Sequence, residues 1–129
     1  MDHDALVEQL QKLAGDVEAK AGPLALFMLV APDIDTNDAW NVVVSAQGLD
    51  TKSRGSAVRL LSELLRSVVD ESHWSQIART TILRTDDPFV KSMNQAFHTE
   101  HRPVILQSCN VPGFEIPKAI VLESKRIAA

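Results

Sequence analysis

The sequence is poor in the residues that build disulfide frameworks, zinc clusters and base-stacking surfaces. It has one cysteine, Cys109, no tyrosine, four phenylalanines and two tryptophans among 129 residues. A single cysteine excludes an internal disulfide and a zinc site made of several cysteines. So few aromatic residues argue against a platform on which nucleobases stack, because such a platform needs exposed rings beside positive charge.

The chain also lacks long apolar runs and an excess of positive charge. Its longest apolar run, LALFMLVA at 24–31, is far shorter than the roughly 20 residues that cross a bilayer as a helix. Thirteen basic against seventeen acidic residues give a net charge of −4, which disfavours general attraction to nucleic acid or anionic lipid. The first ten residues are acidic where a secretory signal is basic, so we expect a cytoplasmic protein without a membrane or nucleic-acid partner.

In the first half of the chain, the apolar pattern predicts a helix, two strands and a second helix. Apolar residues at helical spacing predict the first helix over 4–20, which Gly22-Pro23 stops. LALFMLVA at 24–31 has no alternating polar position and is expected to be a central strand buried on both faces. WNVVVSA at 40–46 is its expected antiparallel partner, and the second helix is expected over roughly 54–70.

The second half is expected to contribute three more strands and a third helix. ARTTILR at 78–84 is rich in β-branched residues and predicts a strand, which follows a short helical turn near 71–76. PVILQSCNV at 103–111 and PKAIVLES at 117–124 predict the last two strands. The order αββαβαββ indicates a single α+β domain over 1–129, with about five strands in a mainly antiparallel sheet and helices packed on it.

The third helix has clear start and stop signals. Asp86 or Asp87 is the expected cap, and Pro88 fits the first turn because its missing N–H is not needed there. Pro103 restricts the residue before it, so the helix is expected to end by about His101.

HTEH at 98–101 places two histidines and a glutamate close together. The spacing matches neither of the helical zinc motifs H-E-x-x-H and H-x-x-E-H, and a third ligand would have to come from His73, Cys109 or a distant acid. Histidines in the last turn of a helix instead interact favourably with the helix dipole. We therefore interpret His98 and His101 as helix-end residues and predict no metal.

The segment QGLDTKSRGS at 47–56 is the candidate ligand-binding loop. It leads from a strand to a helix N-terminus, where free N–H groups favour anions, yet it carries two cations. A bound phosphate or carboxylate would offset these cations, although mere tolerance at an exposed site also explains them. The residues expected to hold an anion are Lys52, Ser53, Arg54, Gly55 and Ser56.

Trp40 and Cys109 are the two other candidate ligand-binding residues. Trp40 begins a strand after a polar loop, so it either anchors a ligand or partner or packs in the core against the first helix. Cys109 ends an apolar strand, where cysteine usually behaves as a small buried hydrophobe. It would act as a nucleophile only with a histidine aimed at it, and no spacing selects one.

Three segments resemble a group of small bacterial proteins of unknown function. The shared features are a Trp-led strand ending in Ser-Ala, an Asp-Pro-Phe helix start with a later Asn, and Ser-Cys-Asn before a final strand. The matching positions, within 24–124, are Trp40, Ser45, Ala46, Asp87, Pro88, Phe89, Asn94, Ser108, Cys109 and Asn110. The element order also resembles profilin-like folds, including roadblock, longin, GAF and PAS modules. That resemblance implies a dimerising scaffold or a small-molecule sensor.

No set of residues predicts a catalytic centre or a cofactor, since the adjacent acids at 86–87 are explained as a helix cap. We expect a protein-interaction or regulatory module rather than an enzyme, a homodimer that works through a sheet edge or a helix face. Its expected partner is a second copy or another protein. One alternative is a domain that senses a small anionic ligand, and another is a metal- or thiol-dependent enzyme using His98, His101 and Cys109.

Overall fold

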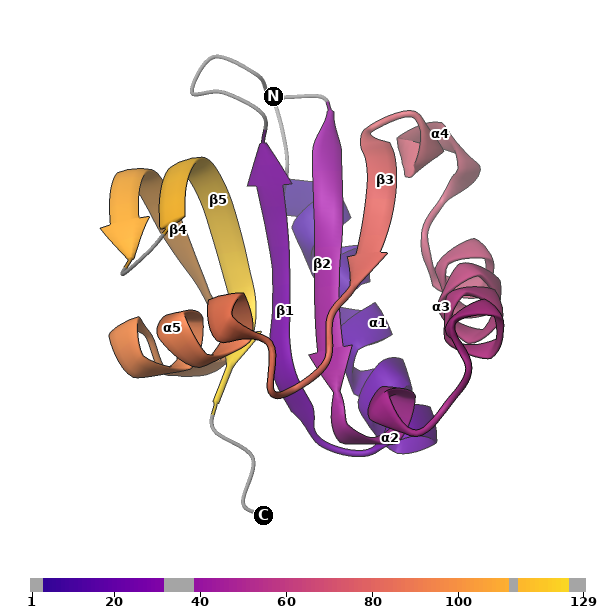
Figure 1. Cartoon of the computed structure of the whole chain (residues 1–129). Coiled ribbons are helices and arrows are strands. Elements are labelled where there is room, and N and C mark those ends of the chain that lie inside the picture. The colour runs from indigo at the N-terminus through magenta and orange to yellow at the C-terminus, as the bar shows by residue number, and fades with distance from the viewer. Residues whose placement is uncertain (1–3, 32–38, 112–113, 126–129) are drawn as a thin grey trace.

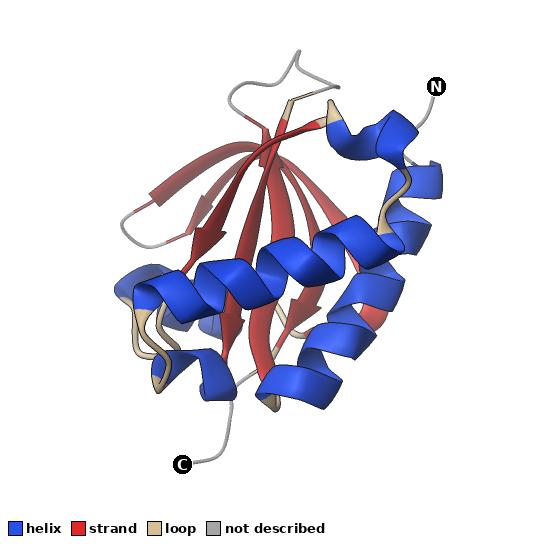
Figure 2. Ribbon diagram, turned by 90° about the vertical axis from the view of Figure 1, so that its right-hand side faces the viewer, coloured by secondary structure: helices blue, strands red, loops and turns tan. Residues whose placement is uncertain are grey.

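The computed structural model describes residues 4–31, 39–111 and 114–125, which form a mixed five-stranded sheet with helices on both faces (Figures 1 and 2). The fold is α+β, as the sequence predicts. The elements are α1 (Asp4–Ala21), β1 (Leu24–Ala31), β2 (Trp40–Ala46), α2 (Gln47–Asp50), α3 (Arg54–Val68), α4 (Glu71–Trp74), β3 (Ile77–Ile82), α5 (Pro88–Ala96), β4 (Thr99–Val111) and β5 (Phe114–Ser124).

The strands lie side by side in the order β3-β2-β1-β5-β4. β1 is central and antiparallel to both neighbours, and β4 and β5 form an antiparallel pair at one edge. β3 is parallel to β2, with Asn41 opposite Arg79 and Val44 opposite Ile82. A parallel pair needs a crossover connection, and α3 lies within the connection between these two strands. The crossover places β3 at the other edge of the sheet.

Two apolar clusters sit on opposite faces of the sheet, and β1 contributes to both. Phe27 and Leu29 pack with α1 and α3, whereas Leu26 and Met28 pack with α5. All four side chains are fully buried, which confirms the predicted two-sided burial of this strand. Each contributes roughly 1.5–3 kcal/mol relative to an exposed side chain. In Figure 2, α3 crosses in front of the strands and α1 runs down the right side of the sheet.

α1 ends as expected at the glycine that follows it. Gly22 adopts a positive φ of 79°, and its N–H donates to the carbonyl of Glu18 at 3.0 Å, which closes the last turn. None of the described helices combines the length and the apolar content needed to cross a bilayer.

α5 begins as predicted but ends earlier than predicted. Asp87 is the N-cap, and its carboxylate accepts the N–H of Phe89 at 2.8 Å. The helix ends at Ala96 rather than near His101, because Thr99 already pairs with Ser124 in the sheet. Pro103 lies within β4, where the register shifts between Glu100 and Val104, so its missing N–H breaks no regular pairing there.

The predicted loop over 47–56 contains a helical turn, α2, that the sequence did not predict. α2 packs tightly against the end of α1: a Cβ atom added to Gly48 would lie 2.2 Å from the carbonyl oxygen of Ala21. Only glycine permits this approach, which fixes α2 beside β2 and the start of α3.

Candidate functional site

β3 forms an edge of the sheet whose outer side pairs with no other described strand. On its inner side, Leu83 donates its N–H to the carbonyl of Val44 at 2.9 Å. Successive residues of a strand direct their backbone groups to alternate sides, so the N–H and C=O groups of Ile82 and Thr80 point away from β2. These groups make an open hydrogen-bonding edge.

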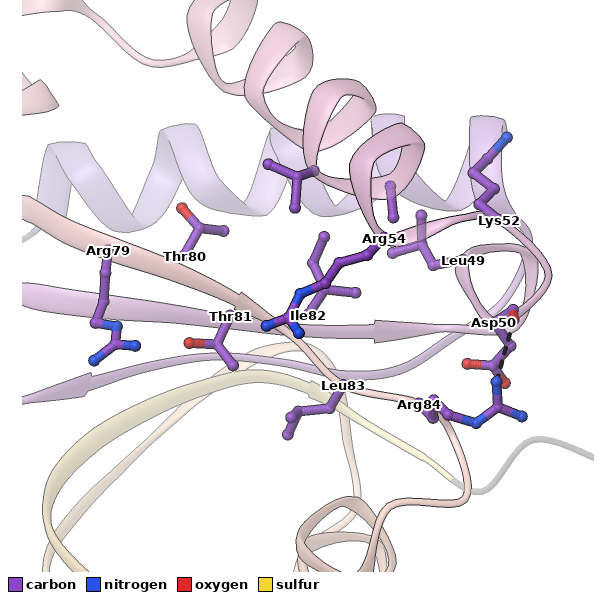
Figure 3. Close-up of a pocket in the computed structure, with 12 residues that line it drawn as sticks. Leu49, Asp50, Lys52, Arg54, Arg79, Thr80, Thr81, Ile82, Leu83 and Arg84 are labelled. Carbon is purple, nitrogen blue, oxygen red and sulfur yellow. Dashed lines mark hydrogen bonds between the residues drawn. The ribbon is translucent and has the colours of Figure 1, made fainter.

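A hollow of about 430 Å³ lies at this edge, between β3 and the start of α3 (Figure 3). Residues 79–84 line one side of it consecutively, with side chains from both faces of the sheet, so the space opens onto the strand's edge. α3 packs mainly on α1, and the hollow is the space that remains between α3 and the edge of β3. The opposite wall comes from α2, α3 and the turn between them, through Leu49, Asp50, Lys52, Arg54, Ala57 and Val58.

The hollow carries four cations and one acid. Lys52, Arg54 and Arg79 come from the α2–α3 turn, the first turn of α3 and the edge strand, and all three are exposed. None of these three side chains makes a hydrogen bond or an ion pair within the described part of the chain. In Figure 3 the side chain of Arg54 reaches from α3 towards β3. The arrangement concentrates positive charge where an anionic group can enter.

Asp50, the one acidic residue that lines the hollow, is hydrogen-bonded to the turn that follows β3. Asp50 accepts the backbone N–H of Thr85 at 3.0 Å and also the hydroxyl of Thr85. The fourth cation, Arg84, donates to the carbonyl of Asp50 at 3.3 Å and pairs with Asp86 at 3.2 Å. These bonds connect α2 to the segment after β3. They involve Asp50 and Arg84 but not Lys52, Arg54 or Arg79, whose side chains can therefore contact a ligand.

A second hollow, of about 270 Å³, lies between α3, α4 and the start of β3. Its lining is more apolar than that of the first hollow. Trp74 presents its ring there: the side chain is 42% exposed, and its indole N–H donates to the carbonyl of Val69 at 2.9 Å. Its lining is Ser62, Leu65, Arg66, Trp74 and Ile77. We call the two hollows and the strand edge beside them the edge groove.

The structure divides the predicted loop residues into two groups. Lys52 and Arg54 line the hollow. Ser53 and Ser56 bond to each other instead, since the Ser53 hydroxyl accepts the N–H of Ser56 at 3.2 Å and caps α3. A Cβ atom on Gly55 would meet nothing within 4 Å, so no close approach requires glycine there. Ser53, Gly55 and Ser56 shape the start of the helix rather than a phosphate cradle.

Trp40 and Cys109 do not come together. Trp40 is fully buried in the cluster beneath α1, as its core interpretation predicts, with the Lys118 ammonium 5.7 Å from its ring centre. Cys109 is half-buried on the opposite face of the sheet, beside a hollow of about 450 Å³ at the β4–β5 hairpin. The sheet separates the two residues, so they cannot line one pocket.

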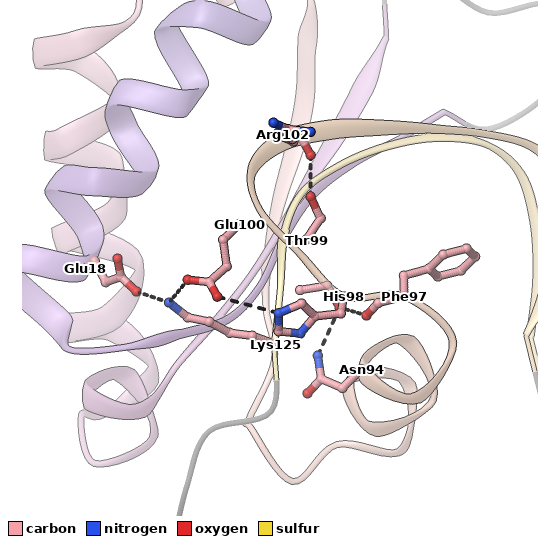
Figure 4. A network of polar contacts seen from close by, with 9 residues as sticks. Glu18, Asn94, Phe97, His98, Thr99, Glu100, Arg102 and Lys125 are labelled. Carbon is pink, nitrogen blue, oxygen red and sulfur yellow. Dashed lines mark hydrogen bonds and ion pairs between the residues drawn. The ribbon is translucent and has the colours of Figure 1, made fainter.

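The histidine cluster is a set of ion pairs near the start of β4 (Figure 4). His98 lies 3.6 Å from the Glu100 carboxylate, which is also 3.6 Å from the Lys125 ammonium. Lys125 donates to Glu18 of α1 at 2.9 Å, and this bond raises the pKa of the lysine above its usual 10.5. No group of three metal-binding side chains occurs among the described residues. Since α5 ends before these residues, the helix-end interpretation of His98 and His101 is wrong.

Two residues of the three segments named in the sequence analysis, Asn94 and Ser108, have local structural roles. Asn94 of α5 donates to the carbonyl of Ala25 at 2.9 Å and to the Ser124 hydroxyl at 3.1 Å, which joins the helix to the two central strands it covers. Ser108 lies within β4 and has a φ of 48°, a left-handed conformation that is uncommon for a residue other than glycine. These structural roles account for Asn94 and Ser108 without a catalytic or binding function.

Sequence reasoning missed the residues that β3 and α4 bring to the site: Arg79, Arg84 and Trp74. The β-branched pattern of ARTTILR at 78–84 predicted a strand. It could not indicate that the crossover would set this strand beside Lys52 and Arg54.

The fold and the site together define an α+β domain with a cationic groove at an open sheet edge. Comparisons with protein-family models, with curated proteins and with solved structures found no match. The resemblances to small bacterial proteins and to profilin-like modules therefore stay predictions.

Proposed function

We propose that the protein is a non-enzymatic interaction module that binds an acidic segment of another protein in the edge groove. The observation that carries this proposal is the group of three cations, Lys52, Arg54 and Arg79, which surround one hollow and have no side-chain partner among the described residues. The whole chain has a net charge of −4, so this local excess of positive charge is not a property of the surface in general. Such a patch attracts carboxylates and accelerates their association.

The charges alone support only modest affinity. An exposed ion pair contributes about 0.2–1 kcal/mol, so three pairs contribute roughly 0.6–3 kcal/mol at low salt. Stronger binding has to draw on the apolar part of the groove, where Trp74 is 42% exposed and Val58 is 48% exposed. We therefore expect a reversible, salt-sensitive interaction.

A small anionic ligand is the second candidate, because about 430 Å³ lies within the usual range of ligand pockets. A small-molecule site normally surrounds its ligand, however, and places a few buried polar groups against it. Here the three cations are exposed and the hollow continues along a strand edge. The geometry therefore favours a longer occupant.

The homodimer expected from the sequence does not fit this edge. Two copies that paired through β3 would bring Arg79 and its neighbouring cations towards their own counterparts, and like charges in such a pair are destabilising. A dimer through another surface stays a prediction, which light scattering at high protein concentration tests.

The proposal is tested with a fluorescent peptide of about eight residues that carries several glutamates and one leucine, a length that suits one edge strand. Fluorescence anisotropy should show binding that weakens with added NaCl, and no binding of the matched peptide with lysines in place of the glutamates. Reversing two cations, in Arg54→Glu with Arg79→Glu, replaces two attractions with repulsions. The cost is about 1–4 kcal/mol, which lowers affinity roughly 5-fold to several hundred-fold.

Arg59→Glu is the matched control. It makes the same charge change on an exposed position of α3 that does not line the groove. Equal loss of affinity in this control, or unchanged affinity in the double reversal, contradicts the proposal. Displacement of the peptide by inorganic phosphate or citrate at comparable concentrations would favour the small-ligand alternative instead.

A further inference from the structure

The sheet has two edges, β3 and β4, and they differ in the features that protect an edge against strand addition. Along the β4 edge, Pro103 lacks an N–H, the pairing register shifts between Glu100 and Val104, and Ser108 has a φ of 48°. Prolines, bulges and kinks of this kind are common protections against strand addition. β3 contains no proline over its six residues, and its outward groups at Thr80 and Ile82 are open.

β3 is also much less covered than the strands inside the sheet. Every residue of β1 and β2 is buried or half-buried, whereas Ala78, Arg79 and Thr80 are exposed and Ile77 and Ile82 are only half-buried. The two hollows flank this strand from its first residue to beyond its last. An added strand would lie about 4.8 Å from β3, between the sheet edge and α3.

The cations are distributed on both sides of such a strand. Arg79 lies opposite Asn41 on the face that α5 covers, since the neighbouring Thr81 hydroxyl bonds to the Asn41 side chain at 3.0 Å. Arg54 comes from α3, on the other face. Consecutive side chains of an extended peptide point to opposite faces of the sheet. Of two adjacent acidic residues, one would therefore form an ion pair with Arg79 and the other with Arg54.

The apolar hollow sets a second requirement. It adjoins Ile77 at the start of β3, whereas the cations gather around residues 79–84. At about 3.3 Å per residue, an apolar side chain in contact with Trp74 would lie roughly three to five residues from the acidic pair.

We infer that the occupant of the edge groove is an extended peptide segment that pairs with β3 as an additional strand, with adjacent acidic residues between Arg54 and Arg79 and an apolar residue against Trp74. This inference rests on the proposed function and specifies its partner. Backbone hydrogen bonds to Thr80 and Ile82 supply affinity, and the two side-chain requirements supply specificity.

The test measures binding of the glutamate and leucine peptide after each of its backbone N–H groups is methylated in turn. In strand addition only alternate N–H groups face β3, so affinity should fall about 2- to 10-fold at every second position and little at the positions between. On the protein, Thr80→Pro removes an outward N–H and should weaken binding by a similar factor. Thr80→Val keeps that N–H and should bind as the wild type does, and circular dichroism confirms that each variant is folded.

The outcomes separate this inference from the proposed function. Loss of binding in the Arg54 and Arg79 double reversal, together with a uniform response to N-methylation, keeps the acidic partner and overturns strand addition. A period-two response with no effect of charge reversal overturns the acidic partner. Full binding by the folded Thr80→Pro variant also overturns strand addition.

Discussion

Replacing Gly48 with alanine should strongly destabilise the protein. The new Cβ atom would lie 2.2 Å from the carbonyl oxygen, 2.6 Å from the carbonyl carbon and 2.9 Å from the Cα of Ala21, and real Cβ atoms essentially never come within 3.0 Å of another heavy atom. All three neighbours are backbone atoms at the end of α1, so no side chain can move aside. Overpacking of this kind costs about 1–3 kcal/mol or more, which lowers the melting temperature by roughly 3–15 °C in a chain of this size.

Gly15→Ala is the matched control, with the opposite expected sign. Gly15 lies on the exposed face of α1, and a Cβ atom there would meet nothing within 4 Å. Alanine in the middle of a helix stabilises by about 0.5–1 kcal/mol relative to glycine, so this variant should melt a few degrees higher than the wild type. Thermal unfolding followed by circular dichroism measures both. A Gly48→Ala variant as stable as the wild type would refute the close packing of α2 on α1.

Two further predictions concern contacts that join distant segments. Asn94→Ala removes two hydrogen bonds between α5 and the central strands, and urea denaturation should show a loss of about 1–3 kcal/mol; a loss below a few tenths would contradict the contacts. Lys125→Gln breaks the ion pair with Glu18 and should cost less than about 1 kcal/mol at neutral pH. Because the pKa of Lys125 is raised in the folded chain, its contribution is complete below 10.5 and disappears as the pH rises through the raised value, so wild type and variant should converge in alkaline solution. A constant difference at all pH values would show that the ion pair is not the cause.

The elements that the sequence predicted well are those determined locally. The run at 24–31 has no polar position, which favours a strand buried on both faces, and Asp87 before Pro88 is a strong local start signal. The end of α5 was predicted wrongly because the competing interaction is not local. Thr99 pairs with Ser124, a residue far along the chain, and no pattern near Pro103 reveals that pairing.

The site was predicted in part for the same reason. Lys52 and Arg54 stood out because cations are unusual at a helix start, and the structure places both of them at the groove. Arg79 and Trp74 had no such local signal, since their proximity depends on the parallel pairing of β2 with β3. Trp40 illustrates the opposite case, an aromatic residue that its position suggested for binding and that the fold buries completely.

The most direct test of the account is the location of the binding surface on the intact protein. Titration of the ¹⁵N-labelled chain with the glutamate and leucine peptide should shift backbone NMR signals of residues 49–58 and 77–84, with the outward N–H groups of Thr80 and Ile82 among the most affected. Shifts confined to the β4–β5 hairpin or to the segment around His98, or no shifts while the lysine peptide produces them, would contradict it.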